Sequence, residues 1–595
     1  MAQVAAVFFA LALGLVTAIG PVLSAGDGPA LKACFAPGTV KADDLLEWEV
    51  SEPDPAWLVT DVGATPRLDI IEPPDGTVTR TRRAFLDRSH RQVPDPAKRA
   101  GEPEYIPEGE PRLRFRHTAR KVGQFGWILR SPQGRELARG SFLVAPAAGP
   151  VGPLRVSRDN PRMLAFADGS IFVAIGPNIA WANGPDRLAG FTRYFTALKE
   201  AGGTHARVWM ASWCGQIEGT APDAYRLDHA WLFDRILALA RRNGLRLTVV
   251  IDNHHDLLHG KNVPYGEPKA DPTAALASRL DAFLAVPVPD QYRRKLAYLM
   301  ARWGADDTIA AWELCNEIDM AQPIREKALP WVKAAAIAIK EADGDDRLHS
   351  ISWAGTDWDR VMGLPGLDLV QMHGYVMEWA DPLGLYRVGT RDGVQMLVGY
   401  ADRANKLKRA FCFSEVGFQG TNEHNPGNDH DRTGLLLRQQ AWAGLMLGGY
   451  GPAMNWWWDN YIDARGLWPV YRGLAAVVAR VNWRDRDLAP LQPGKDGPVR
   501  VLGWQSPSQG LIWPQLRLDT WHRHLEEGKD RPTLGVPVTV RLGGMKKKTK
   551  FTCRWLDMLS GDERSQTAVT TDASGNLDLV VPPKIIDQVC LIGDH

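Results

Sequence analysis

The sequence lacks an excess of charge of either sign. Its 595 residues include 70 Lys and Arg and 69 Asp and Glu, which gives a formal net charge of +1. A nearly neutral chain of this size has no global electrostatic attraction for nucleic acid or for an anionic membrane surface. We therefore expect no nucleic-acid partner, and no membrane contact beyond export.

Cysteine is also scarce, with six residues spread along the chain and no Cys-x-x-Cys spacing. This pattern is not that of a zinc cluster or a dithiol redox motif, so we expect no metal and no cofactor. Cys553 and Cys590 both lie in strand-like runs near the C-terminus. A disulfide between them stays open at this point, because sequence alone does not give their separation.

Charge is absent from residues 1–25, and no later run is long and apolar enough to predict a membrane span. Residues 4–19 are apolar but short for a bilayer, and Ala25 offers a small residue where cleavage can occur. We interpret residues 1–25 as a signal peptide, although Lys and Arg are missing near Met1, with an uncleaved anchor as the alternative. The mature chain is then expected to be a secreted or periplasmic monomer.

Tryptophan, in contrast, is abundant, with 23 residues. Its flat apolar face and single N–H donor suit either large cores or a ligand that stacks on flat rings. Sixteen of the 23 lie between Trp181 and Trp483, and many of these follow predicted strands. This distribution favours a carbohydrate ligand.

Two regions of the sequence, one on each side of the central part, have the pattern of all-β domains. From about residue 45 to 144, short alternating apolar runs are separated by Pro, Gly and Asp, which predicts a β-sandwich of immunoglobulin-like size over residues 26–150. The same pattern returns beyond residue 488. We assign residues 489–595 to a C-terminal β-sandwich domain.

Between them, residues 155–485 alternate strand-like and helix-like segments about every 40 residues. Eight predicted strands begin near residues 171, 205, 247, 309, 350, 369, 410 and 453. Eight such units predict a (β/α)8 TIM barrel of the α/β class. The Gly-Pro-Asn that follows Ile175 lacks the spacing of a dinucleotide-binding loop, which disfavours an open doubly wound sheet.

Two carboxylates stand at the ends of facing strands of this barrel, where βα loops carry the chemistry. Glu317 follows the predicted fourth strand and Glu415 the seventh. Hydrolysis of a glycosidic bond needs one carboxyl to protonate the leaving oxygen and a second to attack or stabilise the anomeric carbon. Either Glu alone would read as an ordinary polar residue of a barrel rim.

The residues at the strand ends together resemble the retaining (β/α)8 glycoside hydrolases, and within them glycoside hydrolase family 5, the cellulase and mannanase family. The resemblance covers about residues 155–485. It departs from the family at Ile318, where Pro is usual. The matching positions in chain order are Arg207, Asp252-Asn-His254, Asn316-Glu317, His373-Gly-Tyr375, Glu415 and Trp458, with Trp457 as the alternative for the last.

The resemblance implies a role for each position. Glu317 would be the general acid/base and Glu415 the nucleophile. Arg207 would keep Glu415 ionised, and Tyr375 would donate a hydrogen bond to it. The other implied substrate-binding residues are Asn316 at the sugar 2-hydroxyl and His254 and His373 around the distorted sugar. Position at a strand end adds Trp458 as a stacking platform, and Asn178 and Trp181 after strand one.

These inferences predict an exported retaining glycoside hydrolase that cleaves β-glycosidic bonds of a polysaccharide or oligosaccharide, of mannan or glucan type by analogy. A barrel that binds carbohydrate without activity is one alternative. A metal-dependent hydrolase of amides or esters is another, suggested by His254 and His255. If those two adjacent residues lie on a strand, they face opposite sides and only one enters the pocket.

Overall fold

A computed structural model describes residues 30–593, and the predicted signal peptide, residues 1–25, lies outside this range. Among the residues described, no helix is both long and apolar enough to cross a membrane. The description omits residues 36–39, 75, 99–100, 148, 150–151, 261–262, 268, 270, 321–324, 356, 377–390, 422–423 and 495.

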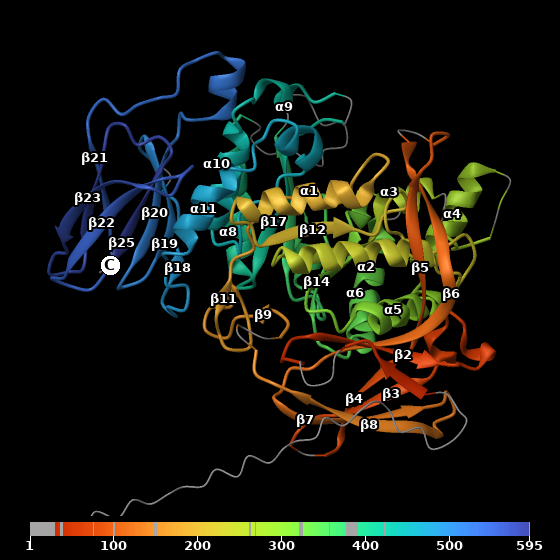
Figure 1. The fold of residues 1–595 in the computed structure, drawn as a ribbon. Helices are drawn as coiled ribbons and strands as arrows, with labels where there is room; N and C mark the ends of the chain where they lie inside the picture. Colours follow the sequence, from red (N-terminus) through yellow and green to blue (C-terminus); the bar gives the residue numbers. More distant parts are fainter. Residues whose placement is uncertain are drawn as a thin grey trace, which may run out of the picture.

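The N-terminal region consists of two antiparallel four-stranded sheets, at the bottom of Figure 1. Residues alternate between buried and half-buried along β2, so that Leu46, Trp48 and Val50 share one face and pack in the core between the sheets. In sheet order the strands are β1 (Ala30–Ala33), β2 (Leu45–Ser51), β6 (Pro103–Thr118) and β5 (Phe85–Pro94), then β4 (Val78–Arg83), β3 (Arg67–Ile71), β7 (Gly123–Arg130) and β8 (Glu136–Val144).

The central region has a core of parallel strands. Strands β14 and β17 are buried along their whole length, as expected for strands covered on both faces. One run of neighbours is β12 (His205–Trp209), β13 (Arg246–Asn253), β14 (Ile309–Asn316) and β15 (Leu348–Ser350), and a second is β16 (Val370–Val376) and β17 (Phe411–Phe418).

Helices alternate with these strands in the chain. They are α1 (Arg187–Glu200), α2 (Leu227–Arg242), α3 (His254–His259), α4 (Pro272–Phe283), α5 (Asp290–Trp303), α6 (Arg325–Ala342), α7 (Asp359–Met362), α8 (Gly393–Lys406), α9 (Pro426–His430), α10 (Leu435–Met446) and α11 (Val470–Val478).

The predicted first and eighth strands are not regular strands. Near residue 171, β11 (Ile171–Phe172) instead joins the small antiparallel sheet of β9 (Arg155–Val156) and β10 (Leu164–Ala165). The chain then makes single parallel bridges, Asn178 to Arg207 and Asn455 to Val416. A proline precedes each bridge, at residues 177 and 452, and cannot donate to a β-ladder. The Asn178 N–H donates to the Asn455 carbonyl at 3.0 Å, which joins the two segments.

The C-terminal region is antiparallel and lies to the left of the core in Figure 1. Cys553 and Cys590 lie on paired strands, and both are free thiols, so no disulfide joins them. One sheet has the order β18 (Ala489–Pro490), β19 (Val499–Gln505), β20 (Gly510–Leu516), β25 (Gln588–Gly593), β22 (Lys550–Asp557) and β23 (Glu563–Thr570), and a second pairs β21 (Val538–Leu542) with β24 (Leu577–Val581).

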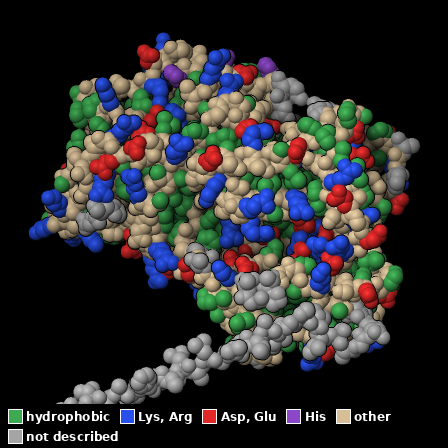
Figure 2. Space-filling view, in the orientation of Figure 1, with side chains coloured by type: hydrophobic (Ala, Val, Ile, Leu, Met, Phe, Trp, Pro, Cys, Tyr) green, Lys and Arg blue, Asp and Glu red, His purple; other side chains and the backbone are tan. Residues whose placement is uncertain are grey.

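The long β5–β6 hairpin leaves the N-terminal sheets and runs beside the helices of the core (Figure 1). On β6, Arg116 pairs with Asp234 of α2 at 2.6 Å. Toward the tip, the Gln92 amide donates to Asp186 at the start of α1. Figure 2 shows basic and acidic side chains interspersed on the face in view, in keeping with the near-zero net charge.

Candidate active site

Arg207, on β12, lies at the centre of a buried hydrogen-bond network at the carboxyl ends of the parallel strands. Its guanidinium donates to both oxygens of Glu313, at 2.6 and 2.7 Å, and to Glu415 Oε1 at 2.7 Å. Burial by itself lowers the pKa of Arg207, but the two carboxylates outweigh it and raise the pKa above its ordinary value. The side chain is therefore a permanent cation beneath the site.

Glu415, on β17, receives two hydrogen bonds that favour its ionised form. Arg207 supplies one, and the Tyr375 hydroxyl from β16 donates the other at 2.7 Å to Oε2. Burial nevertheless raises the pKa of Glu415, and the nearby Glu317 carboxyl adds to that rise against the opposing effects of His373 and Arg207. The carboxyl group is thus desolvated and held in place by two hydrogen bonds.

Glu317 immediately follows β14 and has a left-handed backbone, with φ of 45°. Its Oε1 lies 2.6 Å from Nδ1 of His373, and its Oε2 lies 3.8 Å from Nδ1 of His254. Burial raises the pKa of Glu317, which favours the protonated form that a general acid needs.

His373 lies between the two carboxylates, since its Nδ1 is also 3.6 Å from Glu415 Oε2. Burial lowers the pKa of His373, which keeps the imidazole neutral. One oxygen of each Glu and one His373 nitrogen all lie within 4.8 Å of one another. Such a set suits a sugar held between two carboxyls, and it is also a donor set that a divalent metal accepts.

A cavity of about 230 Å³ opens above this network. Five predicted site residues line it, namely Glu317, Glu415, Asn316, His254 and Tyr375, together with Trp209, Met320, Gln419, Gly420, Trp456 and Trp457. A larger hollow, of about 420 Å³, lies between the N-terminal sheets and α5, but its arginines and aspartates are largely paired with one another or with neighbours. The smaller cavity, with its buried carboxyl pair, is the candidate active site.

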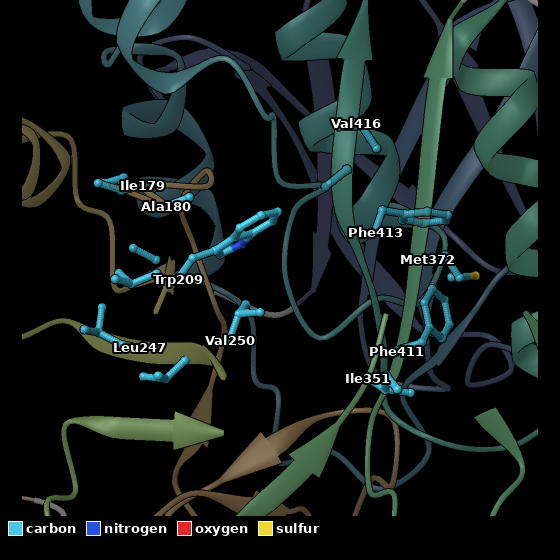
Figure 3. Close-up of a cluster of buried hydrophobic side chains, with 14 of the residues drawn as sticks. Ile179, Ala180, Trp209, Leu247, Val250, Ile351, Met372, Phe411, Phe413 and Val416 are labelled. Carbon is cyan, nitrogen blue, oxygen red and sulfur yellow. The ribbon is translucent and has the colours of Figure 1, made fainter. Parts of the chain in front are cut away.

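Apolar side chains of the parallel strands belong to one large cluster of buried residues. Figure 3 shows Trp209, Val250 and Leu247 on one side of this cluster and Phe411, Phe413 and Met372 on the other. All belong to the large buried core of the central region. This packing fixes the strand ends that carry the polar residues.

Asn178 lies behind the cavity wall and is fully buried. Its amide donates to the Ser414 carbonyl at 2.8 Å, and its Oδ1 accepts from Arg207 at 3.0 Å. These contacts orient Arg207. Asn178 is not among the residues that line the cavity. Its contact with substrate stays a prediction.

The three consecutive tryptophans that follow the last core segment differ in direction. Trp456 and Trp457 line the cavity, and Trp457 Nε1 donates to the Phe418 carbonyl at 2.8 Å. Trp458 is only 2% exposed and donates to the Trp181 carbonyl, with the two rings 4.9 Å apart. The structure thus places Trp457 at the cavity, and Trp458 with Trp181 in the aromatic layer beside it.

The interpretation of His254 and His255 as strand residues is wrong. Strand β13 ends at Asn253, whose side chain caps the short helix α3 that carries both histidines. His254 lines the cavity, with Nδ1 3.3 Å from the Asn316 amide nitrogen, while His255 is exposed. Neighbouring residues of a helix also diverge, so only His254 reaches the site.

Sequence reasoning did not place Met320, Gln419 or Gly420 in the site, and it named Trp209 and Trp456 only as tryptophans that follow predicted strands. The position of Trp209 at the end of β12 and of Trp456 after the last core segment was a usable signal. The others come from loops, whose course is set by tertiary packing.

Solved structures show the class of fold. A Bacteroides vulgatus ATCC 8482 structure described as a glycoside hydrolase superposes with a TM-score of 0.59 and 14% identity, over 93% of this chain and 99% of that one. A glycoside hydrolase family 5 structure from the same organism gives 0.51 and 15%, over 75% and 93%. The chain therefore has the α/β fold of glycoside hydrolases, with a parallel core and antiparallel sheets at both ends.

No protein-family model matches the chain. Comparison with individual sequences does find relatives, and these share one kind of name. Mannan endo-1,4-beta-mannosidase 7 of Arabidopsis thaliana is 25% identical over 246 residues, 36% of this chain and 56% of the relative. Mannan endo-1,4-beta-mannosidase 3 of Oryza sativa subsp. japonica is 30% identical over 196 residues, 30% and 41% respectively. The chain spans about half the length of these relatives, and it resembles glycoside hydrolase family 5.

Proposed function

We propose that the chain is a retaining β-glycoside hydrolase that cleaves a mannan-type polysaccharide or oligosaccharide by double displacement. The observation that carries this proposal is the buried pair of Glu317 and Glu415, with one oxygen of each within 4.8 Å. Retaining enzymes hold their two carboxyl groups about 5–5.5 Å apart, whereas inverting enzymes need about 6.5–9.5 Å to admit a water molecule. The short separation supports retention.

In the first step, Glu415 attacks the anomeric carbon while protonated Glu317 donates its proton to the leaving oxygen. Arg207 and Tyr375 hold the attacking carboxylate in line. A neutral His373 whose proton is on Nδ1 donates to Glu317 Oε1 across the 2.6 Å contact, which leaves the acid proton on Oε2 to reach the leaving oxygen. The products of this step are the free leaving-group sugar and a glycosyl ester on Glu415.

In the second step, ionised Glu317 takes a proton from water, which attacks the glycosyl ester and releases the sugar with its original configuration. The Asn316 amide is placed to bind the 2-hydroxyl next to the reacting carbon, and Trp456 and Trp457 offer apolar ring surface to the sugar. Glu415 returns to its hydrogen bonds with Arg207 and Tyr375.

The proposal extends to the architecture. The six parallel strands, closed by the segments around Asn178 and Asn455, form a (β/α)8 barrel in residues 155–485. Residues 26–150 and 489–595 form separate β-domains. The signal peptide directs export, and fusion of residues 1–25 to a reporter tests this: reporter confined to the cytosol would contradict it.

The decisive test is product analysis with purified mannans and glucans. We expect release of reducing ends from mannan, and proton NMR of the first products should show the β-anomer before mutarotation. Initial formation of the α-anomer would contradict retention. Glycan binding without any release of reducing ends would support the inactive carbohydrate-binding alternative.

A second candidate, a metal-dependent hydrolase, rests on the closeness of Glu317, His373 and Glu415 as metal donors. The two candidates differ in their response to chelators. We expect dialysis against EDTA to leave mannan hydrolysis unchanged. Loss of activity with recovery on adding zinc would favour the metal-dependent reaction.

A further inference from the structure

Glu317 is held in a backbone conformation that residues with side chains rarely adopt. Its φ of 45° lies in the left-handed region, where the Cβ atom crowds the following carbonyl. Such a conformation persists only where neighbouring groups impose it. The contacts of the Glu317 backbone therefore show what imposes it.

Ser352, two residues beyond β15, supplies one such contact. It is fully buried, and its Oγ accepts a hydrogen bond from the Glu317 N–H at 3.1 Å. The same hydroxyl donates to Oδ1 of Asn316 at 3.1 Å. One hydroxyl thus donates to Asn316 and accepts from Glu317, and so contacts both residues of the Asn-Glu pair, and it also interacts with the Glu313 carboxyl.

The contact with Asn316 also sets the direction of that amide. Oδ1 of Asn316 accepts from Ser352 and, at 2.6 Å, from Arg207. Because both neighbours donate, the oxygen must face them, and the amide nitrogen faces His254 and the cavity. Asn316 is then oriented to donate to a ligand hydroxyl.

A second set of hydrogen bonds ties down the turn that carries Ser352. The carboxylate of Asp319, in the short 3-10 helix η4 (Ile318–Met320), accepts from the backbone N–H groups of Ala354 at 2.9 Å and Gly355 at 2.8 Å. Asp319 is fully buried. The segment after Glu317 and the segment after Ser352 therefore hold each other in register.

We infer that Ser352 is a positioning residue, which acts through Glu317 and Asn316: its hydroxyl holds the acid/base in the left-handed conformation and turns the Asn316 amide toward the substrate. The inference rests on the proposed function for its catalytic consequence. The geometry that it describes is independent of which glycan is cleaved.

The primary test is Ser352→Ala, which removes the hydroxyl and adds no atoms. We expect kcat to fall about tenfold through the loss of two hydrogen bonds, with little change in KM. Freed from its buried position, the Glu317 carboxyl loses part of the effect that raises its pKa, so the alkaline limb of the pH–kcat profile should move to lower pH.

Matched variants separate the hydroxyl from packing. Ser352→Thr keeps the hydroxyl and adds a methyl, whereas Ser352→Val adds the same methyl and replaces the hydroxyl with a second one, so only Ser352→Thr should retain the wild-type alkaline limb of the pH–kcat profile. Ser350→Ala removes another fully buried hydroxyl from β15, one with no hydrogen bond to Glu317, and should leave that limb in place. If Ser352→Thr and Ser352→Val both fail to fold, the pH–kcat profile of Ser352→Ala alone tests whether the hydroxyl positions Glu317.

The inference would be overturned if the alkaline limb of the pH–kcat profile were unchanged in Ser352→Ala. It would also be overturned if Ser352→Thr and Ser352→Val had the same alkaline limb. A wild-type chain that cleaves no glycan would refute the proposed function instead. In that case, carbon-13 NMR titration of the Glu317 carboxyl, assigned with Glu317→Gln, still decides: a lower pKa in Ser352→Ala supports positioning, and an unchanged pKa refutes it.

Discussion

Strand β14 has buried charged groups at both of its ends. The two ends differ in how far arginines compensate the carboxylates. Asp307 precedes the strand and Glu317 follows it. At the first end, Asp307 pairs with Arg120 of the N-terminal region and with Arg347, both at 2.8 Å. At the second, Arg207 pairs with Glu313 and Glu415, at 2.6 and 2.7 Å, while Glu317 contacts His373 instead.

The pKa shifts of the carboxyls follow this balance. Burial alone would raise every one of them. Arginines nevertheless hold the pKa values of Asp307, and of Asp345, which also pairs with Arg120 at 2.9 Å, well below the usual range. At the other end Arg207 likewise lowers the pKa of Glu313, but burial prevails at Glu317 and Glu415, and the pKa values of these two are raised. Where arginines balance the buried carboxylates, the ion pairs join the N-terminal region to the parallel core. Where they do not, the raised pKa values favour carboxyl groups that keep a proton.

The largest expected effect is that of Glu415→Ala. Loss of the nucleophile should lower kcat on mannan by at least about 10⁴-fold, while calorimetry should still detect binding of a mannooligosaccharide. Asp345→Asn, at the opposite end, is the control and should keep its kcat. Turnover of Glu415→Ala near the wild-type rate would refute the assigned nucleophile.

Glu317→Gln should have the next largest effect, and one that depends on the leaving group. Without the acid, hydrolysis of substrates with poor leaving groups should fall about 10²–10⁴-fold. Glycosylation by an activated aryl glycoside needs little protonation, so a stopped-flow burst of phenol should persist. Equal losses on both kinds of substrate would count against the acid role.

Asp345→Asn should damage stability and spare catalysis. Asp345 is 1% exposed and accepts hydrogen bonds from Arg82 and Arg120, each at 2.9 Å. Removing its charge takes one buried anionic partner away from each of the two arginines. The free energy of unfolding should therefore fall by about 3–5 kcal/mol. Urea titration measures this, and an unchanged midpoint would show that the pairs contribute nothing.

The pH dependence of melting should separate the two ends with smaller effects. A raised folded-state pKa at Glu317 means that its favourable contribution is complete below the unfolded value, about 4.3, and is lost as pH rises through the folded pKa. A depressed pKa at Asp345 has the opposite sign: its contribution is present above about 3.9 and is lost as pH falls through the folded pKa.

Differential scanning calorimetry from about pH 2 upward, so that the range starts below the unfolded carboxyl pKa values of about 3.9 and 4.3, checks both signs. Relative to wild type, Glu317→Gln should gain melting temperature as pH rises, and Asp345→Asn should lose it. Parallel curves for the two variants would remove the distinction between the ends of β14.

Much of the fold could be predicted from the sequence, because local periodicity is enough to identify alternating strands and helices. The predicted starts near residues 205, 309 and 410 agree closely with those of β12, β14 and β17. The first and last strands of the core were harder, since Gly-Pro steps interrupt their hydrogen bonding and leave single bridges at Asn178 and Asn455.

The candidate site was predictable to a similar extent. Motif order placed Glu317, Glu415 and Tyr375 at strand ends, and the structure gathers them around one cavity. The choice between Trp457 and Trp458 was beyond sequence reasoning, because consecutive residues leave a loop in directions that distant packing selects. Trp458 turns toward Trp181, which lies more than 270 residues earlier in the chain.

By itself, the sequence determined which chemical groups stand at the ends of the strands, since strand periodicity and residue type are local properties. Only the tertiary structure decided their relations: the 4.8 Å limit on the carboxylate separation, the left-handed Glu317 and the Ser352 hydroxyl beneath it. These depend on contacts between separate strands, and a side chain acquires its direction and its pKa only when those contacts exclude water.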